Sequence, residues 1–295
     1  MVRHYKIHTN IDGSDNQILD MTSGKIRFYQ PSDLGLTVNT NVWNSHGIGI
    51  FGDSTINHPS IEFRLETFGD TLEENYKIFN DFISNILKHK YVTLEYTTVL
   101  GTCFADVKLS KVTKKEGYGF NGTFSEKISF DNITMWYVYE QLKFYKIENG
   151  KFNENTKIHT NSRYVYSDKE YVYSTEDNID RFSKWDTKDD IFSFVARLTP
   201  SKNVTNRKYG LRFLNSDDNE YSAIVFNLPN EADFIQINTD INDEYYQAIF
   251  NGQVVNIFSA LDFQRFRTRL FEKGSMELIG IDSVEMNVKR KVDFV

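Results

Sequence analysis

The chain has 295 residues with 41 acidic and 34 basic side chains, a formal net charge of −7. This acidic balance argues against a protein that grips nucleic acid, because such proteins normally carry a basic surface. Phe and Tyr are plentiful (24 and 17 copies) and Pro is scarce at 4, and aromatic residues favour the pleated surface of a sheet. The composition favours β structure in one large or two ordinary domains.

The cysteine count and the hydropathy restrict the setting in which the chain folds. Cys103 is the single cysteine of the sequence, so no disulfide can form within the chain. The N-terminal residues have no apolar stretch of a secretory signal, and no segment approaches the ~20 apolar residues of a membrane span. We therefore expect synthesis and folding in a cytoplasm and no membrane partner.

The first elements in chain order are a long connection, a strand and a helix. Residues 31–59 are rich in Gly and Asn with little periodicity, which predicts a functional loop or an extension. Residues 60–68 alternate apolar and charged side chains and predict a half-buried strand. Residues 71–90 predict an amphipathic helix with a capping box of Thr71 and Glu74. Its apolar stripe consists of Leu72, Tyr76, Phe79, Ile83, Ile86 and Leu87.

The character of the sequence changes near residue 140. Before this point, residues 91–100, 103–112 and 122–139 alternate like strands. From Ile191 onward, short strand-like segments recur between turn signals, a spacing typical of a β-sandwich. We therefore predict two β-rich domains, residues 1–140 with one helix and residues 141–295.

The second domain contains a repeated tyrosine-rich pattern ahead of its sandwich strands. Residues 163–174 contain Tyr-Val-Tyr-Ser twice, around a polar loop that predicts a hairpin. Tyrosine is enriched where proteins bind proteins. The candidate partner-binding residues are the tyrosines of one hairpin face and a tryptophan in the charged link that follows: Tyr164, Tyr166, Tyr171, Tyr173 and Trp185. In the alternative interpretation the hairpin is the first strand pair of the sandwich and its tyrosines cover the core.

A Gly-Asp-Ser block at residues 52–54 resembles the nucleophile block of one esterase family. A serine nucleophile needs a base within hydrogen-bond reach, and that family takes its histidine from an Asp-x-x-His pair late in the chain. Here the last histidine is His159, and Thr156 lies three residues before it. We interpret the block as a glycine turn and predict that the chain is not an enzyme and has no catalytic residues.

Two acidic clusters resemble cation sites only in part. Asp240, Asn242 and Glu244 alternate as calcium ligands would, but Tyr245 takes the place of the glycine at the sharp bend. Hairpin turns at residues 215–220 and 238–244 explain both clusters more simply. No metal-ligand set is complete and no Gly-rich phosphate loop is present, so we predict no metal and no cofactor.

Arginines recur at every second position near the end of the chain. Arg265, Arg267 and Arg269 alternate with other residues, a pattern that fits a nucleic-acid strip. The pattern fits equally a segment whose arginines face solvent or an acidic neighbour. We prefer the second interpretation.

Seven blocks of the sequence, spread from one terminus to the other, are distinctive by their number and order. They are "MVRHYKIHTN", "KIRFYQPSDLGL", "IEFRLETFGDTLEENYK", "NGTFSEKISFDNITMWYVYE", "FIQINTDINDEYYQ", "DFQRFRTRLFEKGSMEL" and "KRKVDFV". None of the blocks is a catalytic motif. Together they resemble the distal tail proteins of siphophages, specifically those of lactococcal phages whose baseplate hub carries arms.

This resemblance implies a mainly β protein with an N-terminal β-rich belt domain and a C-terminal galectin-like β-sandwich. It implies a homo-hexameric ring in the virion, at the distal end of the tail, that connects the tail tube protein to the tail tip protein. Phage DNA would pass through the ring without being specifically bound. An arm extension, for which residues 145–188 are the candidate, would hold the receptor-binding protein.

The galectin-like fold raises an alternative function, a carbohydrate-binding module of a phage adhesion device. Galectins that bind sugar use a His-x-Asn-x-Arg strand and a tryptophan that stacks on the sugar. No histidine follows His159, and Trp185 lies ahead of the sandwich strands. Fold alone does not carry function, so we prefer the structural role.

Overall fold

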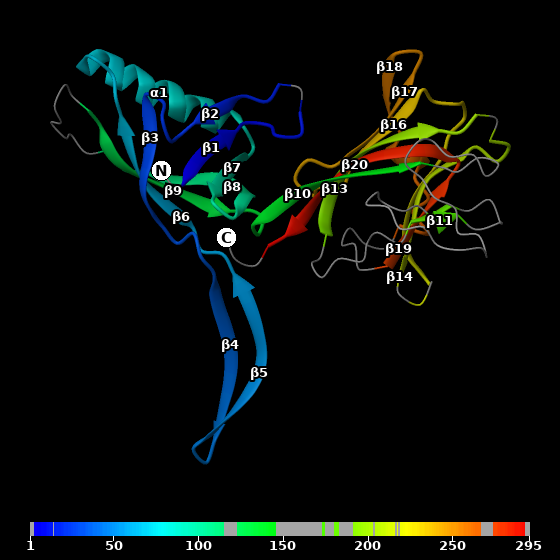
Figure 1. Cartoon of the computed structure of the whole chain (residues 1–295), viewed down its shortest axis with the longest axis horizontal. Coiled ribbons are helices and arrows are strands. Elements are labelled where there is room, and N and C mark those ends of the chain that lie inside the picture. The colour runs from blue at the N-terminus through cyan, green and yellow to red at the C-terminus, as the bar shows by residue number, and fades with distance from the viewer. Residues whose placement is uncertain are drawn as a thin grey trace, which may run out of the picture. The chain divides into compact units, whose positions relative to one another are not determined.

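The structure is a computed structural model that describes residues 3–13, 15–114, 123–145, 173–174, 180–182, 191–202, 204–215, 217, 219–266 and 274–292. The chain divides into two compact units (Figure 1). Unit 1 comprises Met1–Val138 and Lys291–Val295, and unit 2 comprises Tyr139–Arg290. The predicted β-rich fold class is confirmed, and the described ranges contain one α-helix. In those ranges no helix is long and apolar enough to span a membrane.

Unit 1 is an antiparallel β structure covered by a helix. Strand β8 pairs with β7 and the start of β10, and also with β9, so it joins the series β7-β1-β2 to the series β9-β6-β3. The elements are β1 (His4–His8), β2 (Ile18–Asp20), β3 (Ile26–Ser32), β4 (Thr37–Ser45), β5 (Ile48–Asn57), β6 (Ile61–Thr67), α1 (Leu72–Lys88), β7 (Val92–Thr98), β8 (Gly101–Val112), β9 (Ser125–Asn132) and β10 (Tyr137–Tyr145).

Aromatic side chains form the centre of the unit 1 core. Phe63 of β6 stacks on Phe28 of β3 at 4.4 Å between ring centroids and meets Tyr5 of β1 edge to face at 5.2 Å. The alternation predicted for residues 60–68 is confirmed, because Ile61, Phe63 and Leu65 are fully buried. Rings that bridge the two series of strands hold both to one core.

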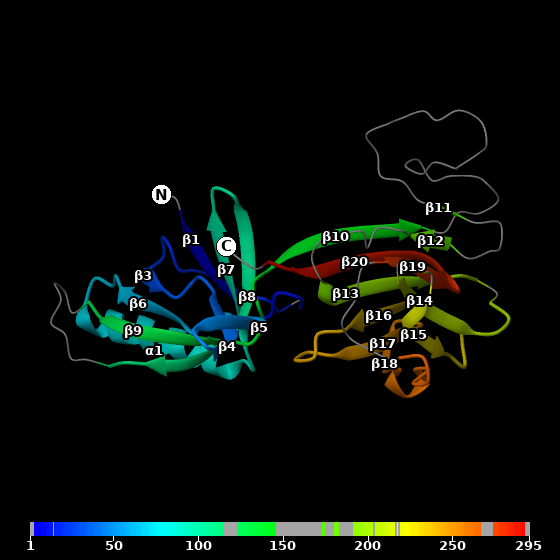
Figure 2. The ribbon, with the colours of Figure 1, turned by 90° about the horizontal axis from the view of Figure 1, so that it is seen from below.

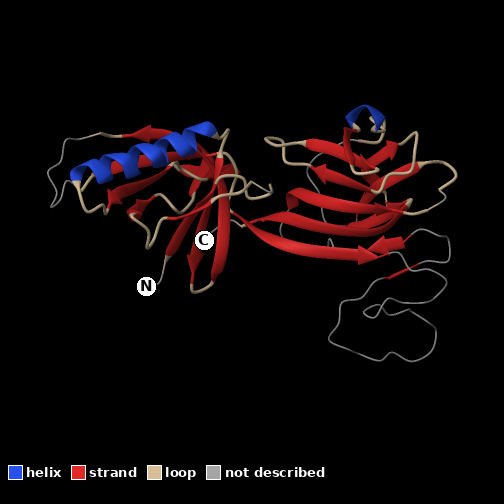
Figure 3. Cartoon of the chain, turned by 90° about the horizontal axis from the view of Figure 1, so that it is seen from above, coloured by secondary structure: helices blue, strands red, loops and turns tan. Residues whose placement is uncertain are grey.

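Helix α1 begins as predicted but turns a different face inward. The Thr71 hydroxyl accepts a hydrogen bond from the Glu74 amide at 3.1 Å, which caps the first turn. The buried residues of α1 are Asn75, Phe79, Phe82 and Ile86, whereas Leu72 and Leu87 of the predicted stripe are exposed. The buried Asn75 amide exchanges hydrogen bonds with the backbone of Gly69, so a polar residue belongs to the inner face. Figure 3 shows α1, in blue, lying along the strands of unit 1.

Unit 2 is a two-layer β-sandwich, as predicted from the spacing of short strands (Figure 2). One layer has the order β18-β17-β16-β13-β20-β10 and the other β11-β12-β19-β14-β15. The elements are β11 (Tyr173–Ser174), β12 (Asp180–Phe182), β13 (Ile191–Pro200), β14 (Lys208–Asn215), β15 (Glu220–Asn227), β16 (Phe234–Asn238), β17 (Tyr245–Phe250), β18 (Gln253–Asn256), the 3-10 helix η2 (Phe258–Ala260), β19 (Gly274–Ile279) and β20 (Ile281–Lys291).

A single apolar core lies between the two layers of unit 2. Phe194 of β13 in one layer is 6.1 Å from Phe213 of β14 in the other, measured between ring centroids. Met286 of β20 and Met276 of β19 belong to the same buried cluster. Burial of these inner faces leaves the outward-pointing side chains of each strand free for other contacts.

Candidate assembly surfaces

Strands β4 and β5 form a two-stranded ribbon that pairs with no other described strand and extends away from the rest of unit 1 (Figure 1). The segment from residue 31 to residue 59 is therefore an extension, one of the two predicted possibilities, and it carries regular strands that its weak periodicity did not predict. A lone two-stranded hairpin is at best marginally stable in water. This ribbon is therefore a candidate for contact with a second surface.

Apolar side chains lie on both faces of the ribbon. Val42 is opposite Phe51, and the next pair, Trp43 and Ile50, points to the other face because successive strand residues alternate. Phe51 is 80% exposed and Ile48 is 69% exposed. Contiguous exposed apolar surface of this kind marks a site of protein interaction.

The backbone fixes the shape of the ribbon at two points. His46 and Gly47 at its tip have φ of 50° and 83°, the left-handed pair that closes a tight hairpin of type I′. At Gly52, a Cβ atom would lie 3.1 Å from the Trp43 ring and 3.2 Å from the Asn41 carbonyl oxygen. Glycine at this position lets the indole lie against the neighbouring strand.

A second exposed apolar site is the turn between β7 and β8. Val99 is 82% exposed and Leu100 is 95% exposed. The Thr98 hydroxyl accepts a hydrogen bond from the Leu100 amide at 3.2 Å and so holds the turn in one conformation. Turns of this kind usually carry Gly, Asn or Asp, and a departure from local turn chemistry is expected at functional positions.

The predicted partner-binding residues are mostly outside the described part of the chain. Tyr164, Tyr166, Tyr171 and Trp185 all lie in segments that the structure does not describe. Tyr173 begins β11, and its backbone pairs with that of Arg181 in β12. Strand β12 pairs in turn with β19 of the sandwich. The predicted hairpin of residues 163–174 therefore stays a prediction.

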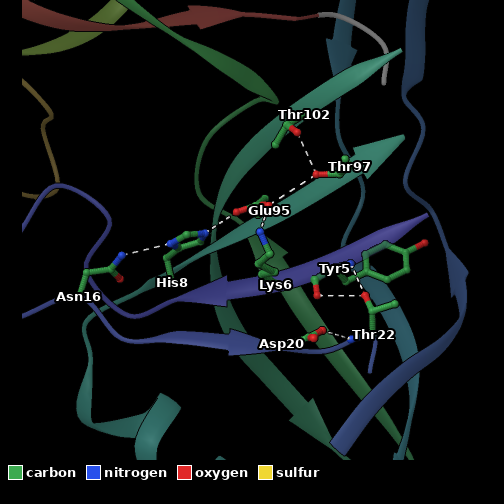
Figure 4. Close-up of polar contacts among 9 residues, drawn as sticks. All are labelled: Tyr5, Lys6, His8, Asn16, Asp20, Thr22, Glu95, Thr97 and Thr102. Atoms are coloured by element: carbon green, nitrogen blue, oxygen red, sulfur yellow. Dashed lines mark hydrogen bonds and ion pairs between the residues drawn. The ribbon is translucent and has the colours of Figure 1, made fainter. Parts of the chain in front are cut away.

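A buried polar cluster ties β1 to β7 in unit 1 (Figure 4). The Glu95 carboxylate lies 2.6 Å from His8 Nε2 and 2.7 Å from Lys6 Nζ. His8 Nδ1 lies 3.1 Å from the Asn16 side-chain amide. Hydrogen bonding by His8 and then Lys6 outweighs burial and lowers the pKa of Glu95 to about 2. These contacts between β1 and β7 fix how the two strands align with each other in the sheet.

The predicted glycine turn at residues 52–54 is wrong. Ser54 lies within strand β5. Its hydroxyl lies 2.9 Å from that of Thr40 across the ribbon, in an exposed position. Such a pair is a cross-strand hydroxyl contact of the kind that stabilises antiparallel strands.

The acidic clusters of unit 2 are hairpin turns, as predicted. The Asp240 carboxylate accepts hydrogen bonds from Lys289 Nζ at 2.8 Å and from the Asn242 amide at 2.9 Å, and both charged side chains are buried. A lysine ammonium thus already neutralises this carboxylate. No three His, Cys, Asp or Glu side chains gather as a metal site within the described ranges.

Of the three arginines at positions 265, 267 and 269, the structure describes Arg265, and this side chain contacts an acidic neighbour. Arg265 donates to both oxygens of Glu220 at 3.0 and 2.7 Å, and Arg212 donates to the same carboxylate at 2.6 Å. This agrees with the preferred interpretation for Arg265. Arg267 and Arg269 lie outside the described residues.

Comparison with known proteins accounts for almost the whole chain. The family model for the distal tail protein N-terminal domain matches residues 4–133, and the family model for the Dit C-terminal domain matches residues 135–295. The chain belongs to the distal tail protein family. Distal tail proteins of Lactococcus phage SK1 and Lactococcus phage p2 are each 52% identical to it, over 100% of both chains. The predicted family is confirmed.

Solved structures of this family agree with the fold. A chain in the structure of the phage p2 baseplate in its activated conformation with Ca matches with a TM-score of 0.83 and 50% identity, over 100% of both chains. The Dit protein of phage SPP1 matches with a TM-score of 0.52 and 11% identity, over 98% of this chain and 99% of that one. The second match shows a shared fold.

Proposed function

We propose that this chain is the hub subunit of a phage baseplate, in the virion at the distal end of the tail. Six copies form a ring that connects the tail tube protein to the tail tip protein and leaves a central exit for DNA. The observation that carries the proposal is the similarity, over the whole chain, to a chain in a solved phage baseplate. The role is structural rather than catalytic.

The β4–β5 ribbon supplies the contact between copies. The ribbon exposes apolar pairs on both faces and cannot bury them within its own unit, since it pairs with no other described strand. A ribbon that lies on a different surface of the next copy makes a head-to-tail contact, and such contacts close into a ring when the rotation permits. We therefore assign ring formation to residues 1–140 and to this ribbon in particular.

The turn between β7 and β8 fits a smaller contact. Val99 and Leu100 offer two apolar side chains on a narrow tip, which is too little area for the main interface of a ring. A tip of this size fits a socket on a protein above or below the ring. We assign it to the contact with the tail tube or the tail tip protein.

The arm that holds the receptor-binding protein remains assigned to residues 145–188. Its gripping surface is the tyrosine face of the predicted hairpin, with Tyr164, Tyr166 and Tyr171 as anchors. Tyr173 would stand at the base of such an arm, because β11 pairs with β12 and β12 pairs with β19 of the sandwich.

Electron microscopy of the purified chain tests the proposed ring. Particles with six-fold symmetry support it, and the double variant Trp43→Ser with Phe51→Ser should convert them to monomers. If the wild-type chain stays monomeric alone, the same test is applied to reconstituted baseplates. A chain that is monomeric within intact virions contradicts the proposal.

A further inference from the structure

Unit 2 carries a shallow polar cavity on the outer face of its larger sheet, away from the sandwich core. The cavity has a volume of about 150 Å³ and is lined by side chains of five neighbouring strands. Register places Arg197 of β13 between Glu285 of β20 and Gln236 of β16. The adjacent row begins with Asn287 opposite Val195.

Carboxamide side chains dominate the polar lining. Gln141, Gln236 and Asn287 each present a donor and an acceptor at the cavity. Their side chains make no hydrogen bond to other residues in the described ranges. Amide groups that both donate and accept suit a ligand that is rich in hydroxyl groups.

The charged groups of the cavity are held in place and balanced. The Arg197 guanidinium lies 4.2 Å from the centroid of the Phe234 ring, a cation–π contact that orients it. Lys143 Nζ lies 2.9 Å from the Glu285 carboxylate. Hydrogen bonding by Lys143, with Arg197 nearby, lowers the pKa of Glu285. Among the residues that line the cavity, Arg197 and Glu285 are the charged ones and carry no net charge together, whereas Lys143 lies outside the lining. The lining therefore favours an uncharged ligand over an anion.

The size and one wall of the cavity restrict the ligand further. An enclosed apolar cavity of about 150 Å³ in another protein holds one benzene ring. The cavity here has a similar volume but is open and polar, so it has room for one six-membered ring that carries polar groups. Tyr245 lies at the edge of the cavity and is half-buried, so it offers part of an aromatic surface. Aromatic side chains with a polar tip bind ligands that have both an apolar and a wet side, and the pyranose ring of a sugar has both.

We propose that this cavity binds one pyranose ring of a neutral saccharide. The amides of Gln141, Gln236 and Asn287 bind its hydroxyl groups, and Tyr245 packs against its C–H face. These residues differ from the His-x-Asn-x-Arg strand and the stacking tryptophan of sugar-binding galectins. The sequence from Ile191 onward has neither histidine nor tryptophan, so the missing galectin signature does not bear on this site. The binding would give a hub subunit its own contact with a glycan, beyond its role in the ring.

Saturation-transfer NMR on the full chain tests the site with four uncharged probes, methyl galactoside, methyl glucoside, N-acetylglucosamine and rhamnose, and with glucuronic acid as the charged comparison. At least one should bind with a Kd near 1 mM, a free energy typical of a small ligand on an open site. Gln236→Ala and Asn287→Ala should each weaken that binding by about fivefold, because each removes one hydrogen-bonding group.

The matched control is Gln253→Ala, which removes an exposed amide from β18 of the same sheet and outside the cavity. It should leave binding unchanged, and all three variants should melt with the wild type. If either Gln236→Ala or Asn287→Ala lowers the melting temperature, the binding measured for the other variant tests the proposal. No transfer to any probe, undiminished transfer in both cavity variants, or binding of glucuronic acid alone would overturn the proposal. None of these outcomes depends on whether the chain forms a ring.

Discussion

Trp43 and Ile50 are directly opposite each other in the β4–β5 ribbon, and they are 64% and 53% exposed. Complete burial of a large apolar side chain contributes about 1.5–3 kcal/mol. Within the described ranges, β4 and β5 pair only with each other. The Trp43–Ile50 pair therefore leaves apolar surface exposed to water, and burial of this surface requires contact with a second molecule.

Removal of these apolar groups should prevent assembly and leave the fold intact. The variant Trp43→Ser with Phe51→Ser loses exposed side chains on both faces of the ribbon, so the melting temperature of the monomer should stay the same. The matched control is Val254→Ser with Phe263→Ser, which removes comparably exposed apolar groups from unit 2. Light scattering should show loss of oligomers in the first variant only. An unchanged oligomer in the ribbon variant would move the ring contact elsewhere.

Replacement of the buried carboxylate in the His8 cluster should give a pH-dependent loss of stability. The folded pKa of Glu95 is about 2, below its ordinary 4.5, so its contribution is complete above pH 4.5 and is lost as the pH falls towards 2. At neutral pH, Glu95→Gln should lower the free energy of unfolding by about 3 kcal/mol. The difference should shrink in denaturant titrations at acid pH.

The control for Glu95 is Glu62→Gln, which breaks the exposed ion pair between Glu62 and Lys127. Exposed ion pairs contribute little to stability, so this variant should unfold like the wild type at every pH. Equal effects of the two substitutions would remove the special role of the buried cluster.

The inner face of α1 should account for much of the stability of unit 1. Phe79→Ala empties a buried position and should cost roughly 2–5 kcal/mol, as other large-to-small core changes do. Leu72→Ala on the same helix removes an exposed side chain and should cost far less. Thermal melts of both variants compare the two faces directly. Equal melting temperatures would mean that α1 packs differently.

Ser54→Ala should leave phage infectivity unchanged. The Ser54 hydroxyl contacts that of Thr40 at an exposed position of the ribbon, so its removal costs only a cross-strand contact. A plaque assay and an ester-hydrolysis assay on the purified chain check this expectation. An esterase rate that disappears in the variant would establish an activity for Ser54.

The arm hypothesis predicts a selective loss of partner capture. Tyr166→Ala with Tyr171→Ala should weaken binding of the receptor-binding protein by at least about a hundredfold, because each hot-spot residue contributes on the order of 2 kcal/mol. The isolated chain should keep its melting temperature. If the tyrosines instead cover the sandwich core, the variant should melt early and still capture its partner when folded. A pull-down and a thermal melt on one preparation separate these outcomes.

Strand β6 and the start of helix α1 could be predicted from the sequence because each depends on residues that are close together in the chain. Ile61, Phe63 and Leu65 alternate because one face of β6 meets the core, and Thr71 caps α1 because the cap needs only neighbouring residues. The inner face of α1 was harder to predict. Asn75 is buried because its side chain forms hydrogen bonds with the Gly69 backbone. A pattern of apolar residues does not reveal a buried polar side chain of this kind.

The strands of the β4–β5 ribbon and the contacts of the His8 cluster could not be predicted from the sequence, and each failure has a physical reason. Strands β4 and β5 have no inner and outer face within one chain, so apolar residues occur on both and the alternation typical of a strand is lost. The His8–Glu95 contact joins residues 87 positions apart and depends on the register of β1 on β7. The apolar run of Val42 and Trp43 before the His46–Gly47 turn was the signal available.

The most direct measurement of the central claim is a reconstruction of the tail end of intact virions by electron microscopy. The hub proposal predicts six copies of this chain in a closed ring around an open channel, with each β4–β5 ribbon lying on the neighbouring copy. A ring of another symmetry, or copies of the chain that touch only other proteins, would contradict it.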